Sequence, residues 1–369
     1  MESFKNESEY LIHMLSGVVN SCGVCEKPDG LDFDKIYRIA KLHSAENTAF
    51  YAVESLKVRP QEQLLKKWSQ RRDMGIMLDI TQLSELEAVC SALKNAGIRC
   101  MPLKGSVIKE LYPQSDMRSM SDLDILVDPE NAGKVGLILT DMGYTVKETG
   151  EGDDVYIKGS RICVEIHKSL FESYFKGFSE MFADPWENAV SNDGFVYRME
   201  SGYFFAYMLA HAAKHYKMGG TGIRSFMDIH IFLKKHGNVP DIPWESFDPH
   251  TRRLCRDFIK LSEIWFGDQP DDGSLDDMKA YIISGGTYGD LSRGEQAQVE
   301  SRGRARYLLE QLFPSMERMI YTFPVLKKAP ILLPFCWIAR PFVKLVKSPR
   351  KVRAKIKALF GSKNSAKTK

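Results

Sequence analysis

The spacing of apolar residues divides the chain into stretches of different periodicity. Up to about residue 95 the apolar positions recur every three to four residues, as in KIYRIAKL, which predicts amphipathic helices. Short apolar runs between Gly-rich and polar turns then predict strands, after which helical spacing returns in SGYFFAYMLAHAAKHYKM. The chain is therefore expected to be an α+β protein with four parts: a helical N-terminal region (1–95), a small core with a mixed sheet (96–172), a helical C-terminal region (173–339) and a tail (340–369).

The central region predicts a particular order of elements. The segment IRCMPLKG is expected to form a short strand that runs into a Gly turn, SVIKELY a helix, and DLDILVD a second strand. The segments YTVKET and DVYIKGS are expected to pair with each other, and RICVEIH adds a further strand. A mostly antiparallel or mixed sheet follows from this order.

Acidic residues stand inside two of these apolar strands. Asp122 and Asp124 are two positions apart, so on a strand they share a face, while Leu123 and Ile125 point the other way. Glu165 lies in the same kind of surrounding, between Val and Ile. Neighbouring carboxylates repel each other unless a cation neutralises them, and Mg²⁺ prefers carboxylate and phosphate oxygens. Acids at strand ends are also common without any metal, so the cluster needs a second signal.

The second signal is the turn formed by Lys104, Gly105 and Ser106, which follows a strand and opens a helix. A Gly lets the backbone come close to a phosphate, and the first turn of a helix offers free N–H groups. Such turns are common, and Lys104 is equally compatible with a structural salt bridge.

Together these motifs resemble the polymerase-β-like nucleotidyltransferase superfamily. More narrowly, MPLKGSVIKELYP followed by MRSMSDLDILV resembles a largely uncharacterised bacterial nucleotidyltransferase group with a KG turn, a downstream Tyr-Pro and R-x-x-x-D-x-D. The resemblance covers about 95 to 345 and takes in HAAKHY and GIRSFMDI. The residues that carry it in the core are Lys104, Gly105, Tyr112, Pro113, Arg118, Asp122, Asp124, Glu165 and His167.

The resemblance implies an enzyme that transfers a nucleoside monophosphate from an NTP, such as ATP, to a hydroxyl group and releases pyrophosphate. The implied cofactor is Mg²⁺ or Mn²⁺. The implied catalytic residues and metal ligands are Asp122, Asp124 and Glu165, the last as ligand or as base. The implied nucleotide contacts are Lys104, Gly105, Ser106 and Arg118. The implied substrate-facing candidates are His167, His211, His215, Arg224 and Asp228.

Some of these candidates have simpler explanations. His211 and His215 have the i, i+4 spacing of a zinc pair, but neither an intervening Glu nor a third ligand is evident, and packing accounts for them equally well. Arg224 and Asp228 have the same spacing, which predicts an intrahelical ion pair.

Charge is distributed unevenly. The tail from 340 to 369 holds eleven Lys or Arg and no acid, so the rest of the chain holds 40 basic and 48 acidic residues, a net charge of −8. An acidic body makes a nucleic-acid acceptor unlikely and favours a small molecule or a protein. The tail suits an anionic membrane surface, although a solvated terminus explains it as well.

Cysteine usage and hydropathy bear on the compartment. Seven scattered cysteines, including a CxxC at Cys22 and Cys25 with no partner motif nearby, indicate reduced thiols more than a zinc or redox site. The polar N-terminus is unlike a signal peptide, and the longest apolar window, 329–339, is too short to span a bilayer. We expect a cytoplasmic protein, with the membrane surface as a peripheral alternative. A nucleotide-binding sensor or a membrane-surface interaction protein of the same fold is the rival to an enzyme.

Overall fold

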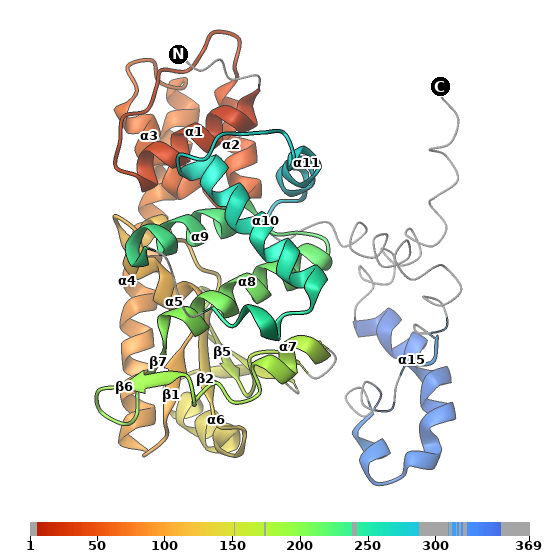
Figure 1. Cartoon of the computed structure of the whole chain (residues 1–369). Helices are drawn as coiled ribbons and strands as arrows, with labels where there is room; N and C mark the ends of the chain where they lie inside the picture. The colour runs from red at the N-terminus through yellow and green to blue at the C-terminus, as the bar shows by residue number, and fades with distance from the viewer. Residues whose placement is uncertain are drawn as a thin grey trace. The chain divides into compact units, whose positions relative to one another are not determined.

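The computed structural model describes most of the chain, namely residues 6–150, 152–172, 175–237, 242–287, 309, 312–314, 316, 319 and 323–347. It divides into two compact units, residues 1–213 with 222–287 and residues 214–221 with 288–369 (Figure 1). The sheet and the predicted core motifs belong to the first unit.

A five-stranded sheet lies at the lower end of the first unit as drawn in Figure 1. Its strands, in spatial order, are β1 (Cys100–Pro102), β2 (Leu123–Val127), β5 (Ile162–His167), β4 (Asp153–Lys158) and β3 (Thr145–Thr149). β2 and β5 run parallel, and the other neighbours are antiparallel. The predicted α+β class and mixed sheet are confirmed.

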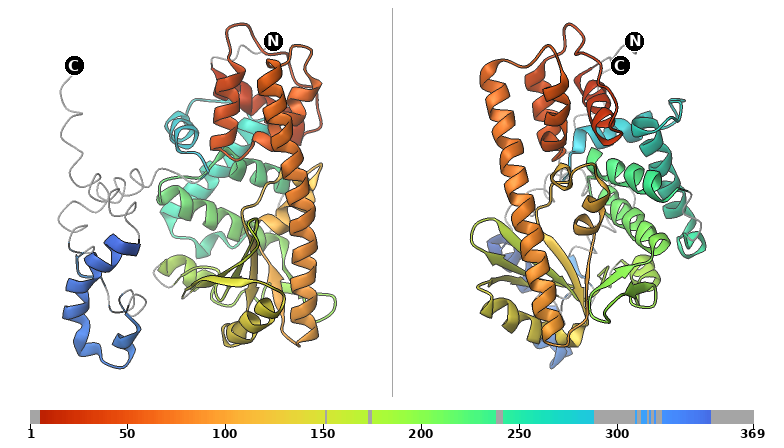
Figure 2. Two further views of the ribbon diagram at one scale, coloured as in Figure 1. Left: turned by 180° about the vertical axis from the view of Figure 1, so that it is seen from behind. Right: turned by 90° about the vertical axis from the view of Figure 1, so that its left-hand side faces the viewer.

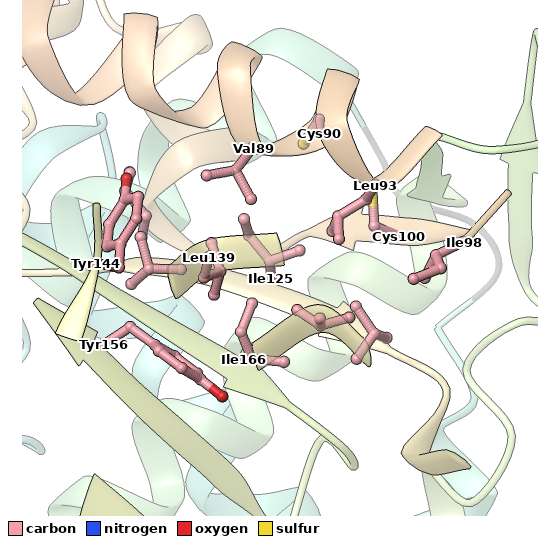
Figure 3. Close-up of a cluster of buried hydrophobic side chains, with 14 of the residues drawn as sticks. Val89, Cys90, Leu93, Ile98, Cys100, Ile125, Leu139, Tyr144, Tyr156 and Ile166 are labelled. Carbon is pink, nitrogen blue, oxygen red and sulfur yellow. The ribbon is translucent and has the colours of Figure 1, made fainter. Parts of the chain in front are cut away.

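The two faces of this sheet differ in chemistry because side chains alternate along each strand. One face is apolar: Ile125 of β2 and Ile166 of β5 pack with Val89 and Leu93 of α4 (Glu62–Asn95) and with Leu139 of α6 (Ala132–Asp141) (Figure 3). The opposite face therefore receives the acids at the intervening positions of β2 and β5.

Short elements connect β1 to β2. The chain passes through α5 (Gly105–Ile108), η1 (Lys109–Leu111) and η2 (Ser115–Met117) before it enters β2, and η3 (Pro129–Asn131) leads from β2 into α6. The predicted helix after the Gly turn is thus confirmed in shortened form, as one α turn followed by a 3-10 turn.

The predicted helical N-terminal region consists of α1 (Glu7–Val19), α2 (Phe33–Leu42), α3 (Glu46–Ser55) and α4. α4 is 34 residues long and runs from this helical group down to the sheet (Figure 2). Buried side chains from α3 and α4 bind the backbone of the β1–β2 connection: Asn47 donates to the Asp116 carbonyl at 2.6 Å, Thr48 to the Met117 carbonyl at 2.6 Å and Gln82 to the Met120 carbonyl at 3.2 Å. The N-terminal helices thereby hold the connection that precedes the acidic strand.

The predicted helical C-terminal region begins with a short helix and a two-stranded hairpin, which precede its longer helices. Its described elements are α7 (Lys176–Met181), β6 (Ala189–Ser191), β7 (Tyr197–Met199), α8 (Ser201–Lys217), α9 (Ile223–His236), η4 (Trp244–Ser246), α10 (Pro249–Phe266) and α11 (Asp276–Gly285). α10 packs on α1, where the Asn20 amide donates to the Phe266 carbonyl at 2.7 Å. The two helical regions therefore contact each other as well as the sheet, and the predicted boundaries near 95 and 172 stay predictions.

The described part of the second unit is small. It includes η5 (Pro324–Lys327), η6 (Pro330–Leu332) and α15 (Leu333–Lys347), and Met319, Leu326 and Cys336 form its buried cluster. Of the basic tail, positions 348–369 lie outside the described residues. Among the helices that are described, none is both long and apolar enough to cross a membrane.

Candidate active site

β2 and β5 bring two of the three predicted acids together. In the parallel register Asp124 stands beside Glu165, and His167 lies two residues further along β5 on the same face. One ligand atom from each of Asp124, Glu165 and His167 falls within 4.8 Å of the others, the one such group of potential metal ligands in the described part of the chain. The polar face of the sheet thus carries two carboxylates and one imidazole at a single point.

Asp122 is placed differently from the prediction. It occupies a bend just before β2, is half-buried, and does not belong to the group formed by Asp124, Glu165 and His167. The structure thus brings together Asp124, Glu165 and His167, while Asp122 acts on Glu165 through its charge, and the role of Asp122 as a metal ligand stays a prediction. The regular strand begins at Leu123, one residue after Asp122.

Asp124 is held by two nitrogen donors on one oxygen. The Lys104 Nζ and the His167 Nε2 each lie 2.7 Å from the Asp124 Oδ1. A carboxylate only accepts hydrogen bonds, so the His167 Nε2 carries the donated proton. Of the two explanations for Lys104, a salt bridge is what the structure contains.

Electrostatics separate the acids. Burial works to raise the pKa of Asp124, but the Lys104 ammonium and the hydrogen bond from His167 hold it below its usual range. Burial and the charges of Asp122 and Asp124 raise the pKa of Glu165 to about 7. Burial, with the Asp124 charge, also raises the pKa of Asp122. Glu165 is consequently the carboxylate that changes its protonation near neutral pH.

The turn at Lys104 has an unusual backbone. Lys104 has φ 49° and ψ −116°, a left-handed conformation that is rare for residues other than Gly. Strained residues of this kind persist where surrounding structure holds them, and they are frequent at functional sites. Here the Leu103 N–H donates to the Asp124 carbonyl at 2.9 Å, and the Ile108 N–H to the Lys104 carbonyl at 3.0 Å, which fixes the turn on both sides.

Gly105 and Ser106 have local partners. A Cβ on Gly105 would come within 2.7 Å of the Met120 Sδ and 3.2 Å of an Arg118 nitrogen, so the residue allows a close packing contact. The Ser106 hydroxyl is buried and donates to the Leu103 carbonyl at 2.7 Å. Packing within the turn therefore explains both residue types, and their predicted contact with phosphates remains a proposal.

Arg118, Tyr112 and Asp228 form a buried hydrogen-bonded cluster, called the Arg118 clasp. The Arg118 Nε donates to the Asp228 Oδ1 at 2.9 Å and its second terminal nitrogen to the Asp228 Oδ2 at 2.9 Å, while the Tyr112 hydroxyl donates to the Asp228 Oδ1 at 2.7 Å. The remaining guanidinium nitrogen donates to the Ser119 carbonyl at 2.9 Å. Every guanidinium nitrogen has a protein acceptor, so Arg118 fastens the β1–β2 connection to α9, and its predicted nucleotide contact stays a proposal.

The predicted intrahelical ion pair between Arg224 and Asp228 of α9 is wrong. Asp228 binds Arg118 and Tyr112 instead of Arg224, and Arg224 donates to the Ser119 carbonyl at 2.8 Å. The spacing was suitable, but the buried guanidinium of Arg118 offers two hydrogen bonds to the same carboxylate. The charge of Arg224 works to lower the pKa of Asp122, so it acts next to the acidic cluster.

The helix α8 carries the remaining histidines. His211 is half-buried and its ring centroid lies 6.0 Å from that of Tyr207, whereas His215 is exposed. Neither histidine belongs to a group of potential metal ligands within the described ranges, which gives the zinc alternative no support there. The exposed Cys22 and Cys25 likewise belong to no such group in the part that is described.

Tyr207 is a residue that the sequence analysis missed. Its hydroxyl is fully buried and has no hydrogen-bond partner among the described residues. Burial raises its pKa, and the charges of Lys104, Asp124 and Glu165 act on it, which shows that this hydroxyl lies near the acidic cluster. The available signal was its i, i+4 relation to His211 on the same helix face.

Two solved structures are similar to the chain at low sequence identity. The crystal structure of ANT(2″)-Ia in complex with adenylyl-2″-tobramycin is similar at 13% identity and a TM-score of 0.34, covering 48% of this chain and 97% of that chain. The solution structure of the antibiotic-resistance factor ANT(2″)-Ia is similar at 12% identity and a TM-score of 0.27, covering 55% and 95%. These superpositions are too loose to carry an argument about the site.

No curated protein matches the sequence. A family model described as uncharacterised nucleotidyltransferase matches residues 29–259, which is more than half of the chain and includes α2 to most of α10 with the whole sheet. The matched segment contains the acidic cluster, the Lys104 turn and the Arg118 clasp. The chain therefore belongs to this nucleotidyltransferase family and is a transferase.

Proposed function

We propose that the protein transfers a nucleoside monophosphate from an NTP to a hydroxyl group of a small molecule or a protein, with a divalent cation and with release of pyrophosphate. The observation that carries the proposal is the pairing of Asp124 and Glu165 on adjacent parallel strands within the segment that matches the nucleotidyltransferase family. Two acids at one point of a polar sheet face give a place where a triphosphate and its cation can be held.

The donor set fits a divalent cation. Carboxylate oxygens suit Mg²⁺ and Mn²⁺, and an imidazole nitrogen can also bind Mn²⁺ and other first-row transition metals. Asp124 and Glu165 would hold the ion together with Asp122, whose charge acts on both of them, and His167 would orient Asp124. The bound cation would neutralise triphosphate charge and favour the departure of pyrophosphate.

Glu165 is suited to the proton step. With its pKa raised to about 7 it can accept a proton near neutral pH, so it is proposed as the base where it does not serve as a ligand. The acceptor oxygen then attacks the α-phosphorus as its proton passes to the Glu165 carboxylate. The bond from the α-phosphorus to the bridging oxygen breaks, and pyrophosphate leaves with the electron pair.

The Lys104 turn is proposed to meet the triphosphate. Lys104 supplies a positive charge, and Gly105 and Ser106 supply backbone N–H groups, since the Ser106 hydroxyl is already bound to Leu103. Arg118 contributes by holding the connection in place through Asp228. His211 and His215 remain proposed acceptor-side residues, and the ring contact of His211 with Tyr207 supports this for His211.

The acceptor is proposed from charge. Outside the tail the chain has a net charge of −8, which disfavours a nucleic acid and agrees with a small molecule or a protein. The tail itself is proposed to reach an anionic membrane surface at most peripherally. Deleting 340–369 would abolish binding to anionic liposomes if that is its role, and unchanged binding would exclude it.

The test is pyrophosphate release from each of the four NTPs with Mg²⁺ or Mn²⁺ and cell extract as the acceptor source. We expect Asp124→Asn to lower release at least about 1000-fold, because preorganised charge at a phosphoryl site contributes on that scale. Glu85→Gln is the matched control: this half-buried acid on α4 pairs with Lys158 and Tyr144, away from the cluster, so release should change less than about twofold.

The same experiment distinguishes the rival function. Nucleotide binding without release in any extract would favour a nucleotide sensor. Release that is equal in the wild type and in Asp124→Asn would exclude the proposed site.

A further inference from the structure

The Asp124 carboxylate already has a cation of its own. The Lys104 ammonium and the His167 ring nitrogen both lie 2.7 Å from the same oxygen, Oδ1. The Asp124 side chain is only 7% exposed, so water has little access to weaken this contact. In the structure the lysine thus provides the positive charge at the point where the acids converge.

A divalent cation bound by Asp124 would have to share this carboxylate with the lysine. Mg²⁺ binds carboxylate oxygens at about 2.0–2.1 Å, so an ion and an ammonium on the same oxygen would stand within about 5 Å of each other. At that separation, beside a carboxylate that is only 7% exposed, the two positive charges repel each other. Occupation by the metal and the present position of the Lys104 Nζ are therefore in conflict.

We propose that the Lys104 ammonium is a resident counter-ion of Asp124 that a divalent cation displaces, and that the released side chain then turns to the triphosphate. The displacement rests on the salt bridge and on the group of potential metal ligands around Asp124, while the second step rests on the proposed function. Lys104 in this view is a positioning residue for the empty enzyme and a substrate contact for the loaded one.

The local structure allows such a movement. The backbone of the turn is fixed by the hydrogen bonds of Leu103 and Ile108, so the change is confined to the side chain. The Lys104 side chain is 21% exposed, three times as much as its Asp124 partner, so part of it already reaches solvent. A lysine has a flexible four-carbon stem and binds phosphate as a point charge, so its head can leave one anion for another without a backbone rearrangement.

The first experiment measures Mn²⁺ affinity by electron paramagnetic resonance, without nucleotide, for the wild type and for Lys104→Met. Removing the competing ammonium should tighten Mn²⁺ binding about tenfold or more. Lys168→Met is a matched control, because Lys168 pairs with Asp154 on the same sheet at 3.0 Å with a similar burial of both side chains. Its Mn²⁺ affinity should equal that of the wild type. Equal or weaker binding by Lys104→Met would overturn the proposal.

The second experiment uses the wild-type protein, so it does not depend on how a variant folds. Lysines are labelled with an amine-reactive ester and quantified by mass spectrometry, with and without Mn²⁺. Labelling of Lys104 should rise several-fold when Mn²⁺ is added, while Lys109, which is buried in another ion pair, stays protected. Labelling of Lys104 that is unchanged by saturating Mn²⁺ would contradict the displacement.

Failure of this inference and failure of the proposed function give different results. Tighter Mn²⁺ binding by Lys104→Met in a protein that releases no pyrophosphate from any NTP would support the displacement and remove the transferase role of the site. Pyrophosphate release by the wild type, together with unchanged Mn²⁺ affinity in Lys104→Met, would do the reverse. If the released lysine reaches the triphosphate, ATP should tighten Mn²⁺ binding more in the wild type than in Lys104→Met.

Discussion

Two lysine–aspartate pairs lie close together in the β1–β2 connection and have different surroundings. Lys104 contacts Asp124 in an acidic cluster and is 21% exposed, whereas Lys109 contacts Asp79 of α4 with only 1% of its side chain exposed. The Ser115 hydroxyl donates to Asp79 at 2.6 Å and completes the second pair.

The difference in surroundings shows in the pKa of each lysine. Burial works to lower the pKa of both. At Lys104 the charges of Asp124 and Asp122 outweigh burial and raise it, whereas at Lys109 burial prevails and lowers it. Lys104 and Asp124 thus form a partly exposed pair with surplus negative charge, called the open pair. Lys109 and Asp79 form a buried pair without that surplus, called the closed pair. The first can exchange its cation, and the second can only hold the connection to α4.

The largest effect is expected at the closed pair. Lys109→Met would leave Asp79 buried without its partner and should lower the free energy of unfolding by about 3–5 kcal/mol, measured by urea denaturation. Lys104→Met should lower it by less than about 2 kcal/mol, because Asp124 keeps the hydrogen bond from His167 and the Lys104 side chain is already 21% exposed. Replacing both partners, as in Lys109→Met with Asp79→Leu, should recover most of the loss. Equal losses at Lys104 and Lys109 would show that the two pairs are not different in kind.

An intermediate effect is expected from the surplus charge around the open pair. The pKa of Glu165 is about 7 in the folded state, above its ordinary value, so the stability it contributes is present at low pH and is lost as pH rises through 7. In a chelator, Glu165→Gln should therefore raise the free energy of unfolding by about 1–2 kcal/mol at pH 8 and leave it unchanged at pH 4.

Glu85→Gln serves as a control of opposite sign for this measurement. Burial works to raise the pKa of Glu85, but hydrogen bonds from Lys158 and Tyr144 lower it overall. Its contribution to stability is thus present above the ordinary carboxylate range, so Glu85→Gln should be destabilising at pH 8. If both variants shift stability in the same direction at pH 8, the assignment of surplus charge to the open pair is wrong.

The smallest effect is the stabilisation that a divalent cation gives to the folded state. At ten times its dissociation constant, Mn²⁺ should add about 1.4 kcal/mol to the free energy of unfolding of the wild type, seen as a higher melting temperature. Asp124→Asn should lose this increment. Asp79→Asn, although less stable, should keep it, because the closed pair takes no part in binding the ion. An increment that survives in Asp124→Asn would place the cation elsewhere.

Much of the architecture could be read from local patterns. Helical spacing predicted the N- and C-terminal helices, and short apolar runs predicted the five strands, because these periodicities are set by side-chain burial within each element. The acids of the site were detectable for a related reason: Asp124 and Glu165 interrupt apolar strands, where a charge needs a partner. The turn at Lys104 was recognisable from its place between a strand and a helix.

The hydrogen-bond and ion-pair partners of these residues could not be predicted from the sequence. The sequence offered Arg224 as the neighbour of Asp228 by its spacing, yet the structure supplies Arg118 from more than a hundred positions away. It offered Asp122 as a metal ligand, which stays a prediction, but it did not indicate that His167 would join Asp124 and Glu165 in one group. Tyr207 had no distinguishing mark except its spacing from His211.

What the sequence determined by itself is therefore the set of elements, the sheet face that bears the acids and the class of chemistry that those acids support. Only the tertiary structure decided which lysine or arginine pairs with which carboxylate. Lys104 and Lys109 are five residues apart in the same connection, and nothing local says that one contacts an open cluster and the other a buried helix face. That choice depends on register and on packing between distant elements, because the energy of an ion pair is set by its burial and its neighbouring charges.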